Sequence, residues 1–257
     1  MRAHHAGMDT TTLLPPASTA VAGLQRPALL VLPGWDDDGR AQYDMLDEDL
    51  ATDGWACRRA DLPDADWPAA ERAAVTREDS LRQALRDYQV LHAQARPDGM
   101  GVLGFSYGGY MAALLAGLYP FDWLVLRSPA IYPDADWLTA KEDLDRRKVD
   151  AYRHTVHTPE GNRALAACAA FKGDVLLVQS EHDEVVPRPV IDSYAWAFGN
   201  ARSLVRHMLL DADHALSQAR WRHTYHAIVV AWLRGRRQEG PPQGSLPFVA
   251  AGTLQLR

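Results

Sequence analysis

The chain has 257 residues, of which 47% are hydrophobic and 23% charged, enough to build the core of one ordinary α/β domain. Its formal net charge of -6 excludes the broad basic face that nucleic-acid binding needs, because the basic stretch 146–148 lies among acidic neighbours. No apolar run approaches the length of a membrane span, and the first 25 residues lack the features of a secretory signal. We therefore expect no nucleic-acid or membrane partner and a cytoplasmic location.

Composition and periodicity divide the chain into three parts. Residues 1–26 contain prolines and scattered small residues, which predict a loosely ordered leader. Strand and helix patterns then alternate over residues 27–234, as expected for a single domain with a mostly parallel central sheet flanked by helices. Residues 235–257 have no supporting periodicity and are predicted to form a C-terminal tail. Cys57 and Cys168 show neither a pairing pattern nor metal-ligand spacing, so both are expected to be free thiols.

The first elements are a strand, a helix and a second strand. The apolar run 28–33 predicts a buried strand, and Gly34 and Trp35 form the turn that follows it. Asp38 is a candidate N-cap for a helix that extends to about residue 52, and residues 55–62 predict the next strand.

A second helix is predicted to start at Thr76. Thr76 and Asp79 have the spacing of a capping box, in which each side chain accepts a hydrogen bond from the other residue's backbone. The helix presents one apolar face, made of Leu81, Leu85, Tyr88 and Leu91.

The most informative motif is Gly104-Phe-Ser106-Tyr-Gly108. It lies between the apolar strand pattern 100–105 and a helix pattern that continues to Leu118. Gly-x-Ser-x-Gly in this context is typical of a nucleophile elbow, a sharp strand-to-helix turn that exposes the serine hydroxyl. Only glycine two positions to either side avoids steric collision in that turn. Ser106 is therefore the candidate nucleophile.

Another strand, 121–126, is followed by a long connection. Residues 131–157 predict a short helical lid insert, too short to be an independent domain, and the crossover helix is expected to start near 158–160. Tyr132 and Trp137 in the insert either project over the nucleophile as a substrate wall or pin the insert to the body, and both readings remain open.

An activated serine needs a base and an acid that orients it, and both have candidates downstream. The strand pattern 175–178 opens into a loop in which Asp183 is the candidate acid, with Glu181 and Glu184 as neighbouring alternatives. A helix over 187–198 and a strand over 203–210 then lead to a loop that contains His214, the candidate base.

Two other histidines compete with His214. His207 falls inside the predicted strand, and His182 adjoins the acid in sequence, so neither is well placed to act on the serine. A final helix over 221–233 completes the core.

The order serine, acid, histidine is the one found in α/β-hydrolases. With Gly-Phe-Ser-Tyr-Gly-Gly-Tyr at residues 104–110 and Asp-x-Val-Val-Pro at 183–187, residues 28–234 resemble the α/β-hydrolase superfamily. The elbow is most similar to the dienelactone hydrolase and prolyl-oligopeptidase branches. That resemblance implies an α/β-hydrolase fold and a serine hydrolase without metal or organic cofactor. Family members often carry His-Gly where this chain has Pro33-Gly34, which alters the support of the first turn.

Attack by the serine also needs backbone donors for the oxyanion. Tyr107 N–H, directly after the nucleophile, is one candidate, and Trp35 N–H is the other, with Asp36 as an alternative. The side chains of Trp35, Tyr107, Tyr132 and Trp137 suggest an apolar or aromatic substrate site. The acidic run 36–38 would disfavour anionic substrates if it faced that site, but it is better interpreted as a solvated cluster at the start of the helix.

The expected activity is cleavage of an acyl ester bond in a small-molecule substrate through an acyl-enzyme intermediate. A small peptidase, thioesterase or lactone hydrolase would use the same machinery, so these alternatives stay open. So does a non-catalytic protein that uses the same fold to bind a ligand. The sequence makes no prediction of oligomeric state.

Overall fold

A computed structural model describes residues 26–36 and 40–239. The predicted leader, the Asp38 cap and the last 18 residues lie outside the described residues. No helix in the described part is both long and apolar enough to cross a bilayer.

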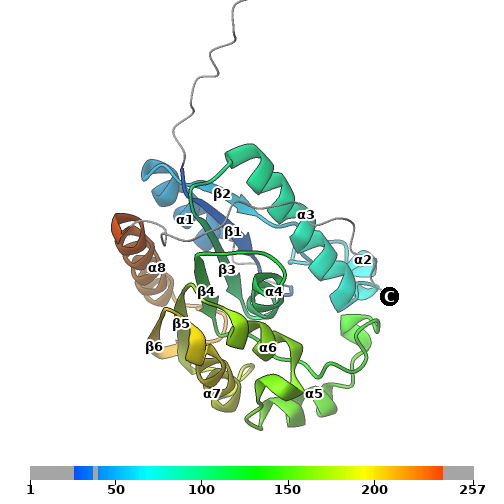
Figure 1. Cartoon of the computed structure of the whole chain (residues 1–257). Coiled ribbons are helices and arrows are strands. Elements are labelled where there is room, and N and C mark those ends of the chain that lie inside the picture. The colour runs from blue at the N-terminus through cyan, green and yellow to red at the C-terminus, as the bar shows by residue number, and fades with distance from the viewer. Residues whose placement is uncertain (1–25, 37–39, 240–257) are drawn as a thin grey trace, which may run out of the picture.

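The centre of the molecule is a parallel sheet of six strands in the order β2-β1-β3-β4-β5-β6 (Figure 1). The strands are β1 (Ala28–Leu32), β2 (Ala56–Arg59), β3 (Met100–Phe105), β4 (Trp123–Arg127), β5 (Asp174–His182) and β6 (Ser203–Asp213). Each pair of neighbouring strands in this sheet is parallel. Strands β1, β3 and β4 are buried along their whole length, because helices cover both faces of the sheet.

Eight α-helices surround this sheet in the described residues. They are α1 (Arg40–Thr52), α2 (Ala69–Ala73), α3 (Arg77–Ala95), α4 (Tyr107–Ala116), α5 (Arg146–Arg153), α6 (Arg163–Ala170), α7 (Arg188–Ala197) and α8 (Ala219–Glu239). One face packs against α1 and α8, with Leu50, Tyr225 and Val229 in its core. The other face packs against α3, α4, α6 and α7, with Tyr88, Met111 and Tyr194 in its core. Figure 1 shows the two sets of helices on opposite sides of the sheet.

The first half of the domain agrees closely with the sequence analysis. Helix α3 starts at the predicted capping box, in which Thr76 Oγ1 accepts from Asp79 N and the Asp79 carboxylate accepts from Thr76 N. The second strand is shorter than predicted and is followed by α2, which was not predicted. Helix α4 ends at Ala116, two residues before the expected end, and Gly117 is its C-cap. The cysteines are free, as expected, and burial raises the pKa of Cys57 to about 12.

Several later boundaries differ from those predicted. The crossover helix α6 begins at Arg163 rather than near Pro159, because the Asn162 side chain caps it by accepting from two backbone N–H groups. Residues 159–161 form only a 3₁₀ turn. Helix α8 continues to Glu239, so the residues 235–239 assigned to the tail are helical. The insert is helical as expected, with a 3₁₀ turn at 141–143 and α5.

Candidate active site

Ser106 lies on a strained turn between β3 and α4. Its backbone has φ 51° and ψ -113°, a conformation that non-glycine residues seldom adopt. The turn brings the chain against its neighbours: a Cβ on Gly104 would lie 2.3 Å from Gly108 O, and one on Gly108 would lie 2.1 Å from Leu32 O. The two glycines are therefore required by space, and the predicted elbow is present in the structure.

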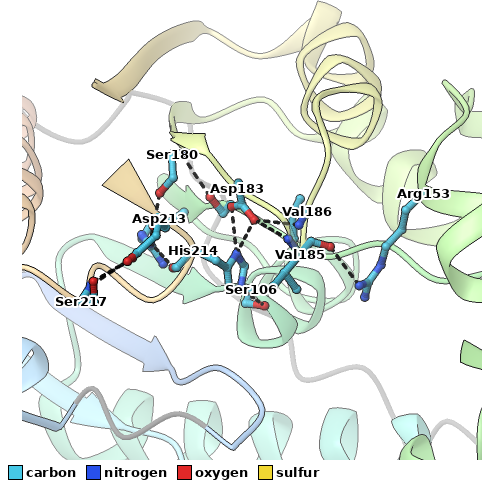
Figure 2. Close-up of polar contacts among 11 residues, drawn as sticks. Ser106, Arg153, Ser180, Asp183, Val185, Val186, Asp213, His214 and Ser217 are labelled. Atoms are coloured by element: carbon cyan, nitrogen blue, oxygen red, sulfur yellow. Dashed lines mark hydrogen bonds and ion pairs between the residues drawn. The ribbon is translucent and has the colours of Figure 1, made fainter. Parts of the chain in front are cut away.

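Three side chains from the ends of different elements meet at this turn (Figure 2). His214 Nε2 lies 3.0 Å from Ser106 Oγ, and His214 Nδ1 lies 2.8 Å from both carboxylate oxygens of Asp183. Asp183 follows β5 directly, and His214 follows β6, so the carboxyl ends of adjacent parallel strands supply both. The structure thus brings Ser106, Asp183 and His214 together in one hydrogen-bonded chain.

The Asp183 carboxylate is 5% exposed and is held by its own loop. Its Oδ1 accepts from Val185 N at 3.0 Å and from Val186 N at 2.8 Å. Burial by itself raises the pKa of Asp183, but hydrogen bonds and the charge of His214, with help from Val186 and Ser128, bring that pKa below its ordinary value. The acid therefore stays ionised and faces the histidine in a fixed orientation.

The alternative acids and histidines lie elsewhere. Glu181 accepts a hydrogen bond from Asp211 N, and both Glu184 and His182 are exposed. His207 is an exposed residue of the edge strand β6.

Arg127 supports the histidine loop, a role that sequence reasoning missed. This arginine ends β4 and is 1% exposed, and its Nη2 donates to His214 O and lies 3.3 Å from Ser180 Oγ. Its Cζ lies 4.0 Å from the centroid of the Phe105 ring, which in turn packs against the His214 ring at 5.1 Å. Arg127, at the end of β4, thus contacts residues at the carboxyl ends of β3, β5 and β6. A charged residue closing an otherwise apolar strand was its only sequence signal.

The candidate oxyanion donors flank Ser106. Leu32 O and Pro33 O approach Gly108 closely, so the turn that carries Trp35 lies against the start of α4. Among the backbone hydrogen bonds of the described residues, none uses Trp35 N or Tyr107 N as donor. Asp36 N, the alternative donor, is already bonded to Pro63 O at 3.1 Å. Trp35 and Tyr107 therefore belong to the two segments that meet at the elbow.

Three of the four predicted substrate-site aromatics form one cluster. The Tyr107 ring contacts Trp35 at 5.1 Å and Tyr132 at 5.9 Å, both edge-on. Tyr107 is almost wholly buried, and its hydroxyl donates to Ser80 Oγ at 2.9 Å. The buried Tyr107 ring therefore packs against both Trp35 and Tyr132.

Trp137 is not brought to this cluster. It lines a groove of about 450 Å³ between α3, α4 and α6, together with Leu81 and Leu118, and its Nε1 donates to Glu78. Arg77 donates to Pro133 O and Ala135 O in the same stretch. These contacts correspond to the second of the two readings, in which the residue pins the insert to the body.

The acidic run near the first turn is partly neutralised. Asp36 Oδ1 pairs with Arg72 Nη1 at 2.5 Å, and Asp37 and Asp38 lie outside the described residues. Asp36, the described part of this run, therefore gives no reason to expect that the site repels anions.

Comparisons with known proteins agree with this geometry. A profile of the prolyl oligopeptidase family matches residues 78–238, which is more than half of the chain. No curated protein matches the sequence.

Solved structures share the fold at low sequence identity. A structure from work on the metagenome-derived lipolytic enzymes LipS and LipT has 18% identity and a TM-score of 0.61, covering 82% of this chain and 95% of that chain. Est1E from Butyrivibrio proteoclasticus has 16% identity and a TM-score of 0.59, with 82% and 88% coverage. The Pyrococcus horikoshii acylaminoacyl peptidase has 13% identity and a TM-score of 0.57, with 82% and 37% coverage. With an α/β-hydrolase fold and this profile match, the chain belongs to the prolyl oligopeptidase family of serine hydrolases.

Proposed function

We propose that this protein cleaves acyl ester bonds through an acyl-enzyme intermediate, with Ser106 as nucleophile, His214 as general base and Asp183 as the acid that orients it. The observation that carries the proposal is the hydrogen-bonded chain from Ser106 Oγ through His214 to Asp183. Family membership supports the same reaction class.

In the first half of the reaction, His214 Nε2 takes the proton of Ser106 as Oγ attacks the acyl carbonyl. Asp183 accepts from His214 Nδ1–H, which fixes the tautomer with the basic nitrogen toward the serine and stabilises the imidazolium that forms. The N–H groups of Trp35 and Tyr107 bind the oxyanion of the tetrahedral intermediate. His214 then returns the proton to the leaving oxygen, and the intermediate collapses to the acyl-enzyme.

In the second half, water replaces the leaving group and His214 takes its proton. Attack on the acyl carbonyl passes through the same oxyanion site, and the acid leaves as His214 returns the proton to Ser106 Oγ. These steps use protein groups alone.

Proteins that share the fold favour an ester as the substrate class. LipS and LipT are described as lipolytic enzymes, and a Rhodothermus marinus structure of the same fold is described as an esterase domain, which supports ester cleavage as the first assignment. Peptide cleavage is the second candidate, supported by the family's name and by the acylaminoacyl peptidase among the structural relatives. This chain covers only 37% of that peptidase.

The test is hydrolysis of 4-nitrophenyl esters from acetyl to long-chain acyl, with Ser106→Ala as the control. We expect turnover that falls by several decades in Ser106→Ala, and covalent labelling of Ser106 by a serine-directed phosphonate. Cleavage of peptide 4-nitroanilides with no ester turnover would favour the peptidase. A Ser106→Ala protein as active as the parent would reject the mechanism, and a protein that binds ligands without labelling would be a non-catalytic homologue.

A further inference from the structure

We propose that the substrate of this site carries a carboxylate close to the scissile carbonyl, and that Lys141 and Arg153 bind it. The inference rests on the proposed function, because it names the substrate class of the same site. Both cations belong to the insert 131–157, and neither takes part in the hydrogen-bonded chain of Ser106, His214 and Asp183.

Lys141 lies on the oxyanion side of the site. Its backbone N–H donates to Val75 O at 2.9 Å, which fixes the 3₁₀ turn at the edge of the body. The Nζ atom lies 4.3 Å from the centroid of the Trp35 ring and 5.7 Å from that of Tyr107. The ammonium therefore packs against the side chains of the two residues whose backbone N–H groups are the proposed oxyanion donors.

Arg153 lies on the side of the acid loop. Its Nη1 donates to Val185 O at 3.2 Å and its Nε to Ile131 O at 3.3 Å. Val185 N donates to the Asp183 carboxylate, so Arg153 reaches the loop that holds the catalytic acid, as Figure 2 shows. The Cζ atom lies 4.9 Å from the centroid of the Tyr132 ring. These partners are neutral carbonyls and a ring, which orient the guanidinium without cancelling its charge.

The acids nearest to Lys141 are engaged with another residue. Asp36 and Glu142, whose charges favour protonation of Lys141, both pair with Arg72, at 2.5 Å and 3.4 Å. Burial, followed by repulsion from Arg153, lowers the pKa of Lys141 to about 8, and the exposed Arg146 adds to the repulsion. A bound carboxylate would relieve this repulsion, and the insert offers it two cations, one packed on the Trp35 ring and one bonded to Val185 O in the loop of Asp183.

Two matched pairs of esters test the proposal and locate the carboxylate. Mono-4-nitrophenyl adipate against 4-nitrophenyl methyl adipate varies the charge on the acyl side. 3-Acetoxybenzoate against 3-acetoxybenzamide varies it on the leaving group. We expect kcat/KM to favour the charged member of one pair by roughly tenfold or more, mainly through KM, as for a hydrogen bond to a charged group. The pair that shows the preference tells whether the substrate carboxylate lies on the acyl side or on the leaving group.

Variants assign the preference to the two cations. Lys141→Gln and Arg153→Gln should each lower the charged-to-neutral ratio severalfold, and the double variant should bring it to about one. Lys141→Arg should keep most of the preference. Lys172→Gln is the matched control, because this exposed lysine precedes β5 at the amino ends of the strands, whereas the site lies at their carboxyl ends.

The outcomes separate this inference from the proposed function. If Ser106-dependent hydrolysis of the neutral esters occurs but both ratios stay near one, the inference is wrong and the proposed function stands. The inference is also wrong if a preference persists in the double variant. If no ester is hydrolysed in a Ser106-dependent way, the proposed function fails and the inference fails with it.

Discussion

Gly108→Ala tests whether the elbow also sets the distance between the two oxyanion donors. An alanine Cβ at this position would lie 2.1 Å from Leu32 O and 2.4 Å from Pro33 O. Both contacts are with backbone, so no side chain can rotate away. Ordinary contact begins near 3.4 Å, so α4 and the end of β1 must separate by about 1 Å.

That separation acts directly on the proposed site. Tyr107 N–H adjoins Gly108, and Trp35 follows β1 by three residues, so the two donors move with the two segments that are forced apart. A displacement of about 1 Å in a catalytic arrangement costs on the order of 100-fold, similar to the loss of one oxyanion donor. Overpacking should also lower the free energy of unfolding by roughly 1–3 kcal/mol.

The assay is kcat/KM for 4-nitrophenyl butyrate, with thermal unfolding followed by circular dichroism. Gly199→Ala is the control, because a Cβ there meets nothing within 4 Å. We expect the Gly108→Ala protein to be folded at 25 °C, with a slightly lower Tm and about 1% of parental kcat/KM. Parental kcat/KM together with parental Tm would refute the steric reasoning. A loss of Tm without loss of activity in the folded protein would refute the link to the oxyanion site.

Four further outcomes follow from the site and its supports. Arg127→Met should lower kcat by tenfold or more with little change in KM, because the His214 loop loses its buried donor; kcat and KM determined separately from initial rates check this. Asp183→Asn should lower kcat about 10⁴-fold, measured against Ser106→Ala as the floor. For Asp174, burial opposes ionisation, but hydrogen bonds from Arg202 and Ser203 bring its pKa below the ordinary value. The ionised carboxylate therefore stabilises the fold above about pH 4, and this stability is lost as the pH falls. The denaturant midpoints of Asp174→Asn and the parent should converge at low pH. The preference for charged esters should fall as pH rises through about 8, where Lys141 loses its proton, and Lys141→Arg should remove that fall.

Residues whose role is set by local geometry could be predicted from the sequence. The serine turn needs glycine at 104 and 108 whatever the rest of the protein does, and the capping box at Thr76 is satisfied within four residues. The positions of Asp183 and His214 follow from the rule that parallel strands deliver their carboxyl ends to one edge. These inferences depend on short-range constraint or on a topology rule, and the structure has the corresponding geometry.

Boundaries and supporting residues could not be predicted in this way. Helix α6 starts where Asn162 caps it, whereas proline at 159 gave an equally good local start signal that begins only a 3₁₀ turn. Strand β5 continues past Val178 to His182, because pairing with β6 continues beyond the apolar residues. The role of Arg127 depends on the distance between β4 and a loop 87 residues away in sequence, which no local pattern reports.

The same contrast explains why reaction type was easier to predict than substrate. The attacking group, base and acid come from the turn and the strand ends, where the sheet leaves little freedom. The proposed substrate cations come from the insert, whose position depends on scattered tertiary contacts such as Arg77 to the carbonyls of Pro133 and Ala135. Trp137, a large aromatic residue in that insert, was a natural candidate for the substrate wall, yet its Nε1 donates to Glu78, while Lys141 packs on the Trp35 ring and Arg153 donates to Val185 O. Charges in such an insert can change without disturbing the elbow, so the insert is where related chains of this fold would differ in specificity.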